Sequence, residues 1–240
     1  LLLLTTACSE APQSTGSVST TAAETAVVTA AEIQAESQRA NQLFEKIFMD
    51  GVMRSPMYQS YLGIKDNQDK WDDISDEKAA EELAIAKENL AQVMAIDADK
   101  LDRQTYVSWL LMKQRLENEI EDYQWRHYNY PVNQMFGMHS SVASMLINQH
   151  RITDIADAEA YIARLNGLPT LFEQLSENLK IRAEKGIMAP KFVYPYVISD
   201  SKNIISGAPF DDGEPSVLLA DFSTKVGHLD IDQEQHDQLL

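Results

Sequence analysis

The sequence predicts an all-α protein, built as a bundle-like array of many helices. Apolar residues recur three and four residues apart over several long segments, which is the spacing of one helical face. Ser, Thr or Asp stands at the start of most of these segments, where a side-chain oxygen caps a helix. No stretch alternates apolar and polar residues over the length of a strand. Helices joined by short connections then pack up and down against one another.

The first helix is expected over about residues 31–50, ending or loosening at Gly51. Its apolar stripe consists of Ile33, Ala40, Phe44 and Ile47. Ser55 and Pro56 then provide a cap and a first-turn proline for a short helix that ends before Gly63. In the polar loop that follows, we expect Trp71 and Ile74 to pack onto the core.

Ser75 is the expected N-cap of the next helix, because acidic residues follow it in the first turn. A long helix is predicted over about residues 99–126. One line of this helix carries Trp109, Met112, Leu116, Ile120, Tyr123 and His127. Apolar Val107, Leu110 and Leu111 lie beside that line. So wide an apolar band predicts that the helix is buried against two neighbours.

The second half of the chain predicts further helices. The first covers residues 140–149, and Thr153 or Asp154 caps the next. An apolar stripe then runs from Tyr161 to Leu179, and we favour one kinked helix over two helices that meet at Pro169. Three more helices are expected, one beginning near residue 190, one over residues 216–228 and one from residue 232.

The N-terminal segment is typical of an exported protein. Four Leu residues precede Thr5, Thr6, Ala7 and Cys8, so residues 1–8 are interpreted as the remnant of a signal peptide that ends at a lipobox Cys8. Lipidation of Cys8 would anchor the protein to a membrane of the bacterial cell envelope. Thr5 departs from the Leu usual at its position, so an ordinary secretory signal remains an alternative. Residues 9–30 are rich in Ser, Thr and Ala and predict a flexible linker to the helical domain.

The charge of the chain excludes some partners. Lys and Arg number 20 against 37 Asp and Glu, which gives a net charge of -17. Such a surface repels phosphate backbones, so we expect no nucleic-acid partner.

Known catalytic motifs are absent from the sequence. None of the five histidines begins an H-E-x-x-H motif, and no phosphate-binding glycine loop is present. His127, His139 and His150 are too dispersed to predict a shared metal site, and we expect no cofactor in this segment. Asp211, Asp212 and Glu214 do not match a calcium loop, so a solvated acidic loop is the favoured interpretation.

The stretch from Tyr123 to His150 is the best candidate for a binding surface, because polar and aromatic residues gather between helices there. Candidate substrate-cleft residues are Tyr130, Asn133, Gln134 and His139. The alternative is structural: the aromatic side chains pack the bundle, and the amides bond loop backbone groups.

Four segments carry a family resemblance. They are SPMYQSYLGIKDNQDKWDDIS, IDADKLDRQTYVSWLLMKQRLENEIE, YPVNQMFGMH and DAEAYIARLNGLPTLFEQLSENLKIRAEKGIMAP. In this order, over about residues 38–240, the chain resembles the N-terminal half of the bacterial family called domain of unknown function 885. The resemblance implies the N-terminal part of a larger helical, zincin-like protein. It also implies a zinc metallopeptidase whose H-E-x-x-H-like motif lies in the C-terminal half.

This resemblance sets the functional expectations. Residues 31–240 are interpreted as a helical domain truncated at its C-terminus, and both ends of the chain as fragment boundaries. The complete protein is expected to hold zinc and to act on a peptide-like substrate, whereas this chain alone is expected to be inactive. The alternative is a non-catalytic envelope lipoprotein whose helical domain binds a peptide or a protein.

Overall fold

The computed structural model describes residues 28–240, so Cys8 and residues 9–27 of the expected linker lie outside the described residues. Within the described part, α-helices alternate with loops and short 3-10 turns, and no strand forms. The helices are α1 (Ala30–Met53), α2 (Pro56–Leu62), α3 (Asp76–Met94), α4 (Arg103–Asp122), α5 (Met138–Asn148), α6 (Ile155–Glu184), α7 (Tyr194–Ile204), α8 (Val217–Val226) and α9 (Gln233–Leu239). The predicted all-α fold is confirmed.

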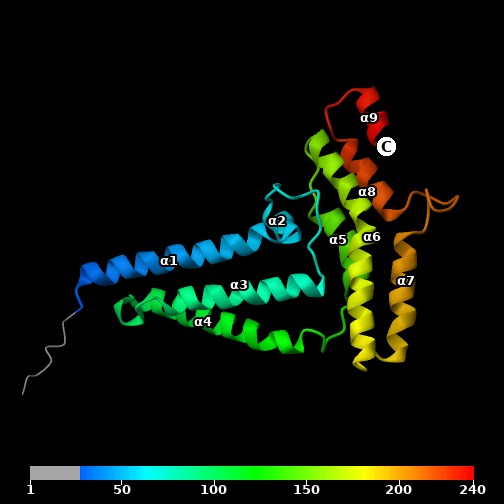
Figure 1. Cartoon of the computed structure of the whole chain (residues 1–240). Helices are drawn as coiled ribbons and strands as arrows, with labels where there is room; N and C mark the ends of the chain where they lie inside the picture. Colours follow the sequence, from blue (N-terminus) through cyan, green and yellow to red (C-terminus); the bar gives the residue numbers. More distant parts are fainter. Residues whose placement is uncertain (1–27) are drawn as a thin grey trace, which may run out of the picture.

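The helices form two groups that run across each other (Figure 1). Helices α1, α3 and α4 lie side by side and extend as an arm. Helices α5 to α8 form a second layer at the end of the arm that lies away from the start of α1. Helix α9 lies near the tip of this second layer. The loop between α2 and α3 and the segment between α4 and α5 connect the two groups.

Side-chain caps fix where the helices of the arm begin. Thr29 and Glu32 form a capping box at the start of α1. Ser75 accepts a hydrogen bond from the Lys78 amide, and Asp102 accepts one from the Thr105 amide. Each cap satisfies an amide that has no partner inside its own helix.

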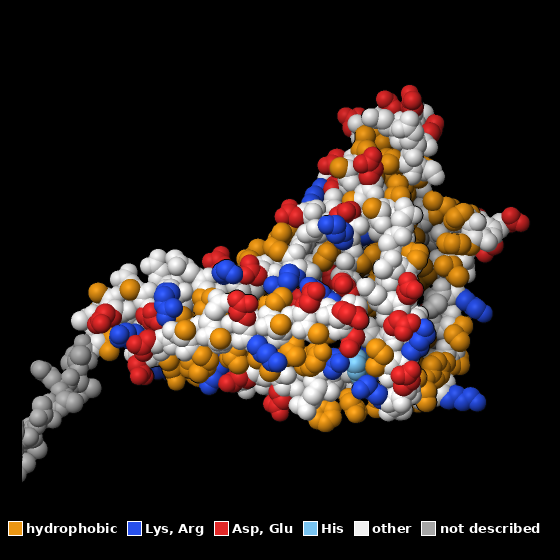
Figure 2. Space-filling model, viewed as in Figure 1, with side chains coloured by type: hydrophobic (Ala, Val, Ile, Leu, Met, Phe, Trp, Pro, Cys, Tyr) orange, Lys and Arg blue, Asp and Glu red, His pale blue; other side chains and the backbone are white. Residues whose placement is uncertain are grey.

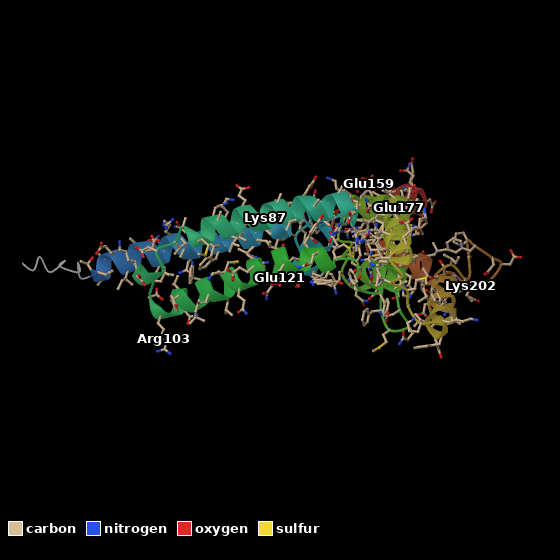
Figure 3. All side chains as sticks on the ribbon, turned by 60° about the horizontal axis from the view of Figure 1, so that its bottom comes forward. Lys87, Arg103, Glu121, Glu159, Glu177 and Lys202 are labelled. Carbon is tan, nitrogen blue, oxygen red and sulfur yellow. The ribbon has the colours of Figure 1, made fainter. Side chains whose placement is uncertain are left out.

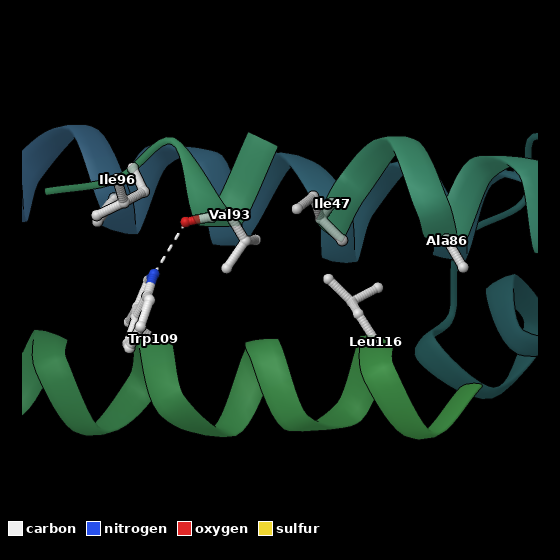
Figure 4. Packing of buried hydrophobic residues seen from close by; sticks show 7 residues of the cluster. Ile47, Ala86, Val93, Ile96, Trp109 and Leu116 are labelled. Carbon is white, nitrogen blue, oxygen red and sulfur yellow. Dashed lines mark hydrogen bonds between the residues drawn. The ribbon is translucent and has the colours of Figure 1, made fainter. Parts of the chain in front are cut away.

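The core of the arm fills the space between its three long helices. Its buried members are Ala40, Ile47, Ala86, Val93, Ile96, Trp109 and Leu116. The indole N–H of Trp109 donates to the Val93 carbonyl oxygen at 2.9 Å, as Figure 4 shows. This bond gives the buried polar atom of Trp109 a partner and ties α4 to the C-terminal turn of α3.

A second core lies among α5, α6 and α8. Its buried members are Val142, Leu146, Ala158, Tyr161, Leu171, Phe222 and Val226. Trp71 and Ile74 pack against this core from the loop before α3, as predicted. Pro169 lies inside the single helix α6, which confirms one helix rather than two. No helix among residues 28–240 is both long and apolar enough to cross a bilayer.

Three sequence expectations about the arm are corrected. Helix α1 continues through Gly51 to Met53, and α4 ends at Asp122 before a 3-10 turn rather than at residue 126. The apolar band of α4 is also less buried than its width predicted, since Leu111 is 63% exposed. The two neighbours of α4, α1 and α3, cover only one side of it. Figure 2 shows apolar side chains along the lower edge of the arm, where α4 runs in Figure 1.

A buried arginine binds the connecting loop to the second layer. Arg164 of α6 is 0% exposed. Its guanidinium donates to the carbonyl oxygens of Lys70 and Pro56 at 2.9 and 3.2 Å and to Ser60 Oγ at 2.8 Å. It also donates to His150 Nδ1 at 3.0 Å. Four chain segments therefore meet at one side chain.

His150 and Asp157 extend this polar network. The Nε2–H of His150 donates to the Asp157 carbonyl oxygen at 2.9 Å, because its Nδ1 accepts from Arg164. Burial of His150 lowers its pKa to about 4, so the ring is neutral near pH 7. The carboxylate of Asp157 accepts hydrogen bonds from Lys65, Gln68 and Thr153. Burial alone would raise the pKa of Asp157. The hydrogen bonds from these donors have the larger combined effect, so the pKa of Asp157 lies well below its usual range.

Candidate functional site

A pocket lies where the arm meets α6, and five of its lining residues belong to the stretch from Tyr123 to His150, which we call the central stretch. Its volume is about 290 Å³. It is lined by Ile74, Ser75, Asp76, Ala79, Arg126, His127, Asn129, Pro131, Met138, Leu175, Asn178 and Arg182. We call it the junction pocket. It combines an apolar wall with several convergent polar groups, which is the usual composition of a small-molecule site.

Asp76 is the acidic group of the junction pocket. It is the first residue of α3, directly after the N-cap Ser75. Its carboxylate accepts two hydrogen bonds from Arg126, from Nε at 2.8 Å and from Nη2 at 3.2 Å. Hydrogen bonding to Arg126 is the main reason that the pKa of Asp76 lies below its usual value. Asp76 is therefore ionised near pH 7.

His127 lies against the same carboxylate. Its Nε2 is 2.9 Å from Oδ1 of Asp76, and the residue is 5% exposed. Burial and the neighbouring Arg126 lower the pKa of His127, while Asp76 acts in the opposite direction. A neutral His127 donates its Nε2–H to Asp76. The sequence interpretation, in which His127 only completes an apolar stripe, missed this polar contact.

Arg182, in the last turn of α6, forms the opposite side of the pocket. Its Nη1 donates to the Asn178 carbonyl oxygen at 2.8 Å, and its Nη2 donates to the Arg126 carbonyl oxygen at 2.9 Å. Nε and Nη2 also donate to Asn129 Oδ1, at 3.1 and 2.9 Å. Burial lowers the pKa of Arg182, and a guanidinium still stays charged at neutral pH.

The four predicted cleft residues lie near the junction pocket in sequence, but none of them lines it. Tyr130 and Gln134 are exposed. Asn133 Oδ1 accepts from the amides of Met135 at 2.8 Å and Phe136 at 3.1 Å, so this side chain shapes its own loop. Contact of these residues with a substrate remains a prediction.

His139, the fourth of them, is buried at the start of α5. Neither ring nitrogen has a hydrogen-bond partner among the residues that the structure describes, although Nε2 lies 3.8 Å from Oδ2 of Asp200. Gly137 allows the His139 ring to pack closely against the backbone of the chain before α5. Its φ is +148°, and a Cβ there would lie 2.7 Å from the Pro131 carbonyl oxygen and 2.9 Å from His139 Nδ1.

The described residues do not fit a zinc site. Among residues 28–240, no three His, Cys, Asp or Glu side chains gather in a group that could hold a metal ion. In the acidic loop, the carboxylate of Asp211 accepts from the amides of Gly207 and Gly213 at 2.9 and 2.8 Å, so it organises that loop. Zinc ligands of the complete protein would have to come from other residues.

Sequence reasoning gave three polar members of the junction pocket structural roles only: Ser75 as a helix cap, Asp76 as an acidic residue that favours the helix dipole, and His127 as the end of an apolar stripe. It missed Arg126, Asn129, Asn178 and Arg182. The one available signal was local: Asn178 and Arg182 are four residues apart on one helical face. No such local signal exists for the hydrogen bonds that Arg182 makes to Asn129 and Arg126, because these residues are 53 and 56 positions away from it.

The fold and this site define an all-α protein with a polar, ligand-sized pocket between two helical layers. The family described as "Bacterial protein of unknown function (DUF885)" matches residues 56–239, and the chain belongs to that family. Searches of curated proteins and of solved structures found no match.

Proposed function

We propose that the chain is the N-terminal helical portion of a lipid-anchored, exported zinc metallopeptidase-like protein. The observation that carries this proposal is the family match over residues 56–239, together with the ordered motifs whose resemblance implies a zincin-like peptidase. The Leu run of residues 1–4, followed by small residues and Cys8, supports export and lipid anchoring in the cell envelope.

Within such a protein, this portion would contribute substrate-binding surface. The junction pocket offers the guanidinium of Arg126, the amide side chains of Asn129 and Asn178, and an apolar wall. The exposed aromatic residues of the central stretch lie close to it in sequence. A peptide-like substrate needs all three kinds of contact. The zinc and its general base are expected from residues outside the described ones, so no catalytic step is assigned to a side chain of this chain.

The second candidate is a non-catalytic envelope lipoprotein with a helical peptide- or protein-binding domain. The observation that favours it is that charged and amide groups converge on the junction pocket together with an apolar wall, which suits the binding of a ligand. An H-E-x-x-H-like motif with a further acidic ligand in the complete reading frame separates the two candidates.

The proposal is tested on the protein produced from its native gene in its own cells. We expect the protein in the membrane fraction and expect Cys8→Ser to release it, because serine has no thiol for a diacylglycerol group. We also expect the purified protein to cleave unstructured peptides until a chelator is added, whereas the 240-residue chain does not cleave them. Retention of Cys8→Ser in the membrane contradicts the anchor, and a native protein that cleaves no peptide contradicts the peptidase.

A further inference from the structure

We infer that the junction pocket binds a carboxylate, held by the guanidinium of Arg126, with the apolar part of the same ligand against the wall of the pocket. The chemical class is an apolar carboxylic acid, either the C-terminal residue of a peptide or a free small acid. As a statement about a peptide substrate, this inference rests on the proposed function. As a statement about binding, it stands on the geometry of the pocket alone.

The first argument is the number of free donors on Arg126. A guanidinium carries five N–H groups, one on Nε and two on each Nη. Nε and one N–H of Nη2 donate to Asp76, and one N–H of Nη1 donates to the Tyr123 carbonyl oxygen at 3.1 Å. One N–H on each Nη therefore remains, without a partner among the described residues. Two such donors on adjacent nitrogens match the two oxygens of a carboxylate.

The second argument is that the guanidinium is already held in place. Asp76 fixes one edge of it through two hydrogen bonds, and the Tyr123 ring stacks on it with 4.1 Å between Cζ and the ring centroid. Arg126 is only partly buried, with 29% of its side chain exposed, so a ligand can reach the remaining donors. A fork held in this way loses little entropy on binding.

The third argument is the charge balance of the pocket. Arg126 and Arg182 provide two positive charges and Asp76 one negative charge, while His127 is neutral near pH 7. One positive charge is left over, in a chain whose net charge is -17. Within the described residues, every hydrogen bond donated by Arg182 goes to an amide or carbonyl oxygen rather than to a carboxylate. A ligand carboxylate would offset this buried charge.

The fourth argument is the size and chemistry of the rest of the pocket. A volume of about 290 Å³ lies at the lower end of the range for ligand sites, which is about 300–1,000 Å³. Its apolar wall consists of Ile74, Ala79, Pro131, Met138 and Leu175. The wall and the fork together select an acid with one apolar side chain over a bare anion.

The first experiment uses the unmodified 240-residue chain and three probes: N-acetyl-leucine, N-acetyl-leucinamide and acetate. We expect the Arg126 side-chain NMR signals to shift on titration with N-acetyl-leucine and not with N-acetyl-leucinamide, which lacks the carboxylate. The signals of Arg103 serve as an internal reference, because Figure 3 places Arg103 at the end of the arm that lies away from Glu177 of α6. Equal shifts with acid and amide, or no shift at Arg126, would overturn the inference.

The acetate titration tests the apolar wall. Tighter binding of N-acetyl-leucine than of acetate supports an apolar acid, because only the former fills the wall, and equal binding of the two contradicts the inference. A further titration with 4-methylpentanoate, an apolar acid without the peptide amide, separates the two sources: tighter binding of N-acetyl-leucine supports a peptide C-terminus, and equal binding supports a free small acid. In either case the result is a binding constant, so it is independent of whether the complete protein hydrolyses peptides.

A pair of variants then tests the role of the fork. Arg126→Lys keeps the charge beside Asp76 but removes the two adjacent donors, and we expect it to weaken N-acetyl-leucine binding at least about tenfold. Arg103→Lys is the matched control on exposed surface and should bind like the unmodified chain. Circular dichroism checks that both variants fold. A folded Arg126→Lys that binds as tightly as the control contradicts the inference.

Discussion

Replacing Arg164 by alanine will lower the free energy of unfolding by about 3–5 kcal/mol. The reason is that Arg164 is fully buried and donates to the carbonyl oxygens of Lys70 and Pro56, to Ser60 Oγ and to His150 Nδ1. Within the described part of the chain, the Lys70 oxygen and His150 Nδ1 then lose their only partner, whereas Ser60 Oγ still donates to the Pro56 oxygen at 3.1 Å. Each buried polar group left unpaired costs about 1–3 kcal/mol, and the empty volume adds a cavity penalty.

One term acts in the opposite direction. Alanine also removes the cost of burying a guanidinium that has no carboxylate within hydrogen-bonding distance among the described residues, and burial lowers the pKa of Arg164 to about 10. Arg164→Met separates the two contributions, because methionine fills most of the volume but donates nothing. We expect the methionine variant to lose less than the alanine variant. Urea unfolding measures both, with the exposed Arg103→Ala as the control. A stability of Arg164→Met equal to that of the unmodified chain would contradict a stabilising role for these hydrogen bonds.

Acidification will destabilise the fold through His150. Burial, opposed by the hydrogen bond to Asp157 and reinforced by Arg164, lowers the pKa of His150 from 6.5 to about 4. Between pH 6.5 and 4, His150 is therefore protonated in the unfolded chain and neutral in the folded chain. This contribution to stability is fully present above pH 6.5, is lost progressively as the pH falls from 6.5 to 4, and is gone below pH 4. Its size is about 3 kcal/mol, from 1.36 kcal/mol for each unit of pKa.

His150→Gln tests this assignment by urea unfolding at a series of pH values between 6.5 and 4. Glutamine does not titrate, so we expect a flatter dependence of unfolding free energy on pH, together with lower stability at neutral pH. His228→Gln, at an exposed histidine, should keep the full slope. If His150→Gln and His228→Gln show the same slope as the unmodified chain, a group other than His150 causes the acid sensitivity. His127 is the next candidate, because burial also lowers its pKa from 6.5, so its contribution to stability is lost in the same pH range.

The helices were predictable because their signals are local. The caps at Ser75, Asp154 and Ser216 and the apolar stripe of α6 each lie within one element, so no knowledge of tertiary structure was needed. The burial of α4 was not predictable in the same way. Its apolar band gives the direction of the core, but the exposure of Leu111 depends on where α1 and α3 lie.

The junction pocket could not be predicted for a related reason. Asp76 begins α3, and Arg126 lies 50 residues further on, in the segment after α4. Arg182 comes from the end of α6, which runs across that arm (Figure 1). Only the crossing of the two layers places these charges around one volume. Sequence reasoning therefore chose the right stretch, Tyr123 to His150, but other residues within it: Asn133 shapes its own loop, and His139 is buried outside the pocket.

The metal content of the native protein tests the proposed function most directly. The protein is purified from the cell envelope without chelators, and its zinc is measured together with peptide hydrolysis before and after the zinc is removed. We predict stoichiometric zinc, loss of hydrolysis when zinc is removed and recovery when it is restored. A native protein that retains no zinc, and whose activity does not respond to added zinc, would contradict the peptidase proposal and favour the binding lipoprotein.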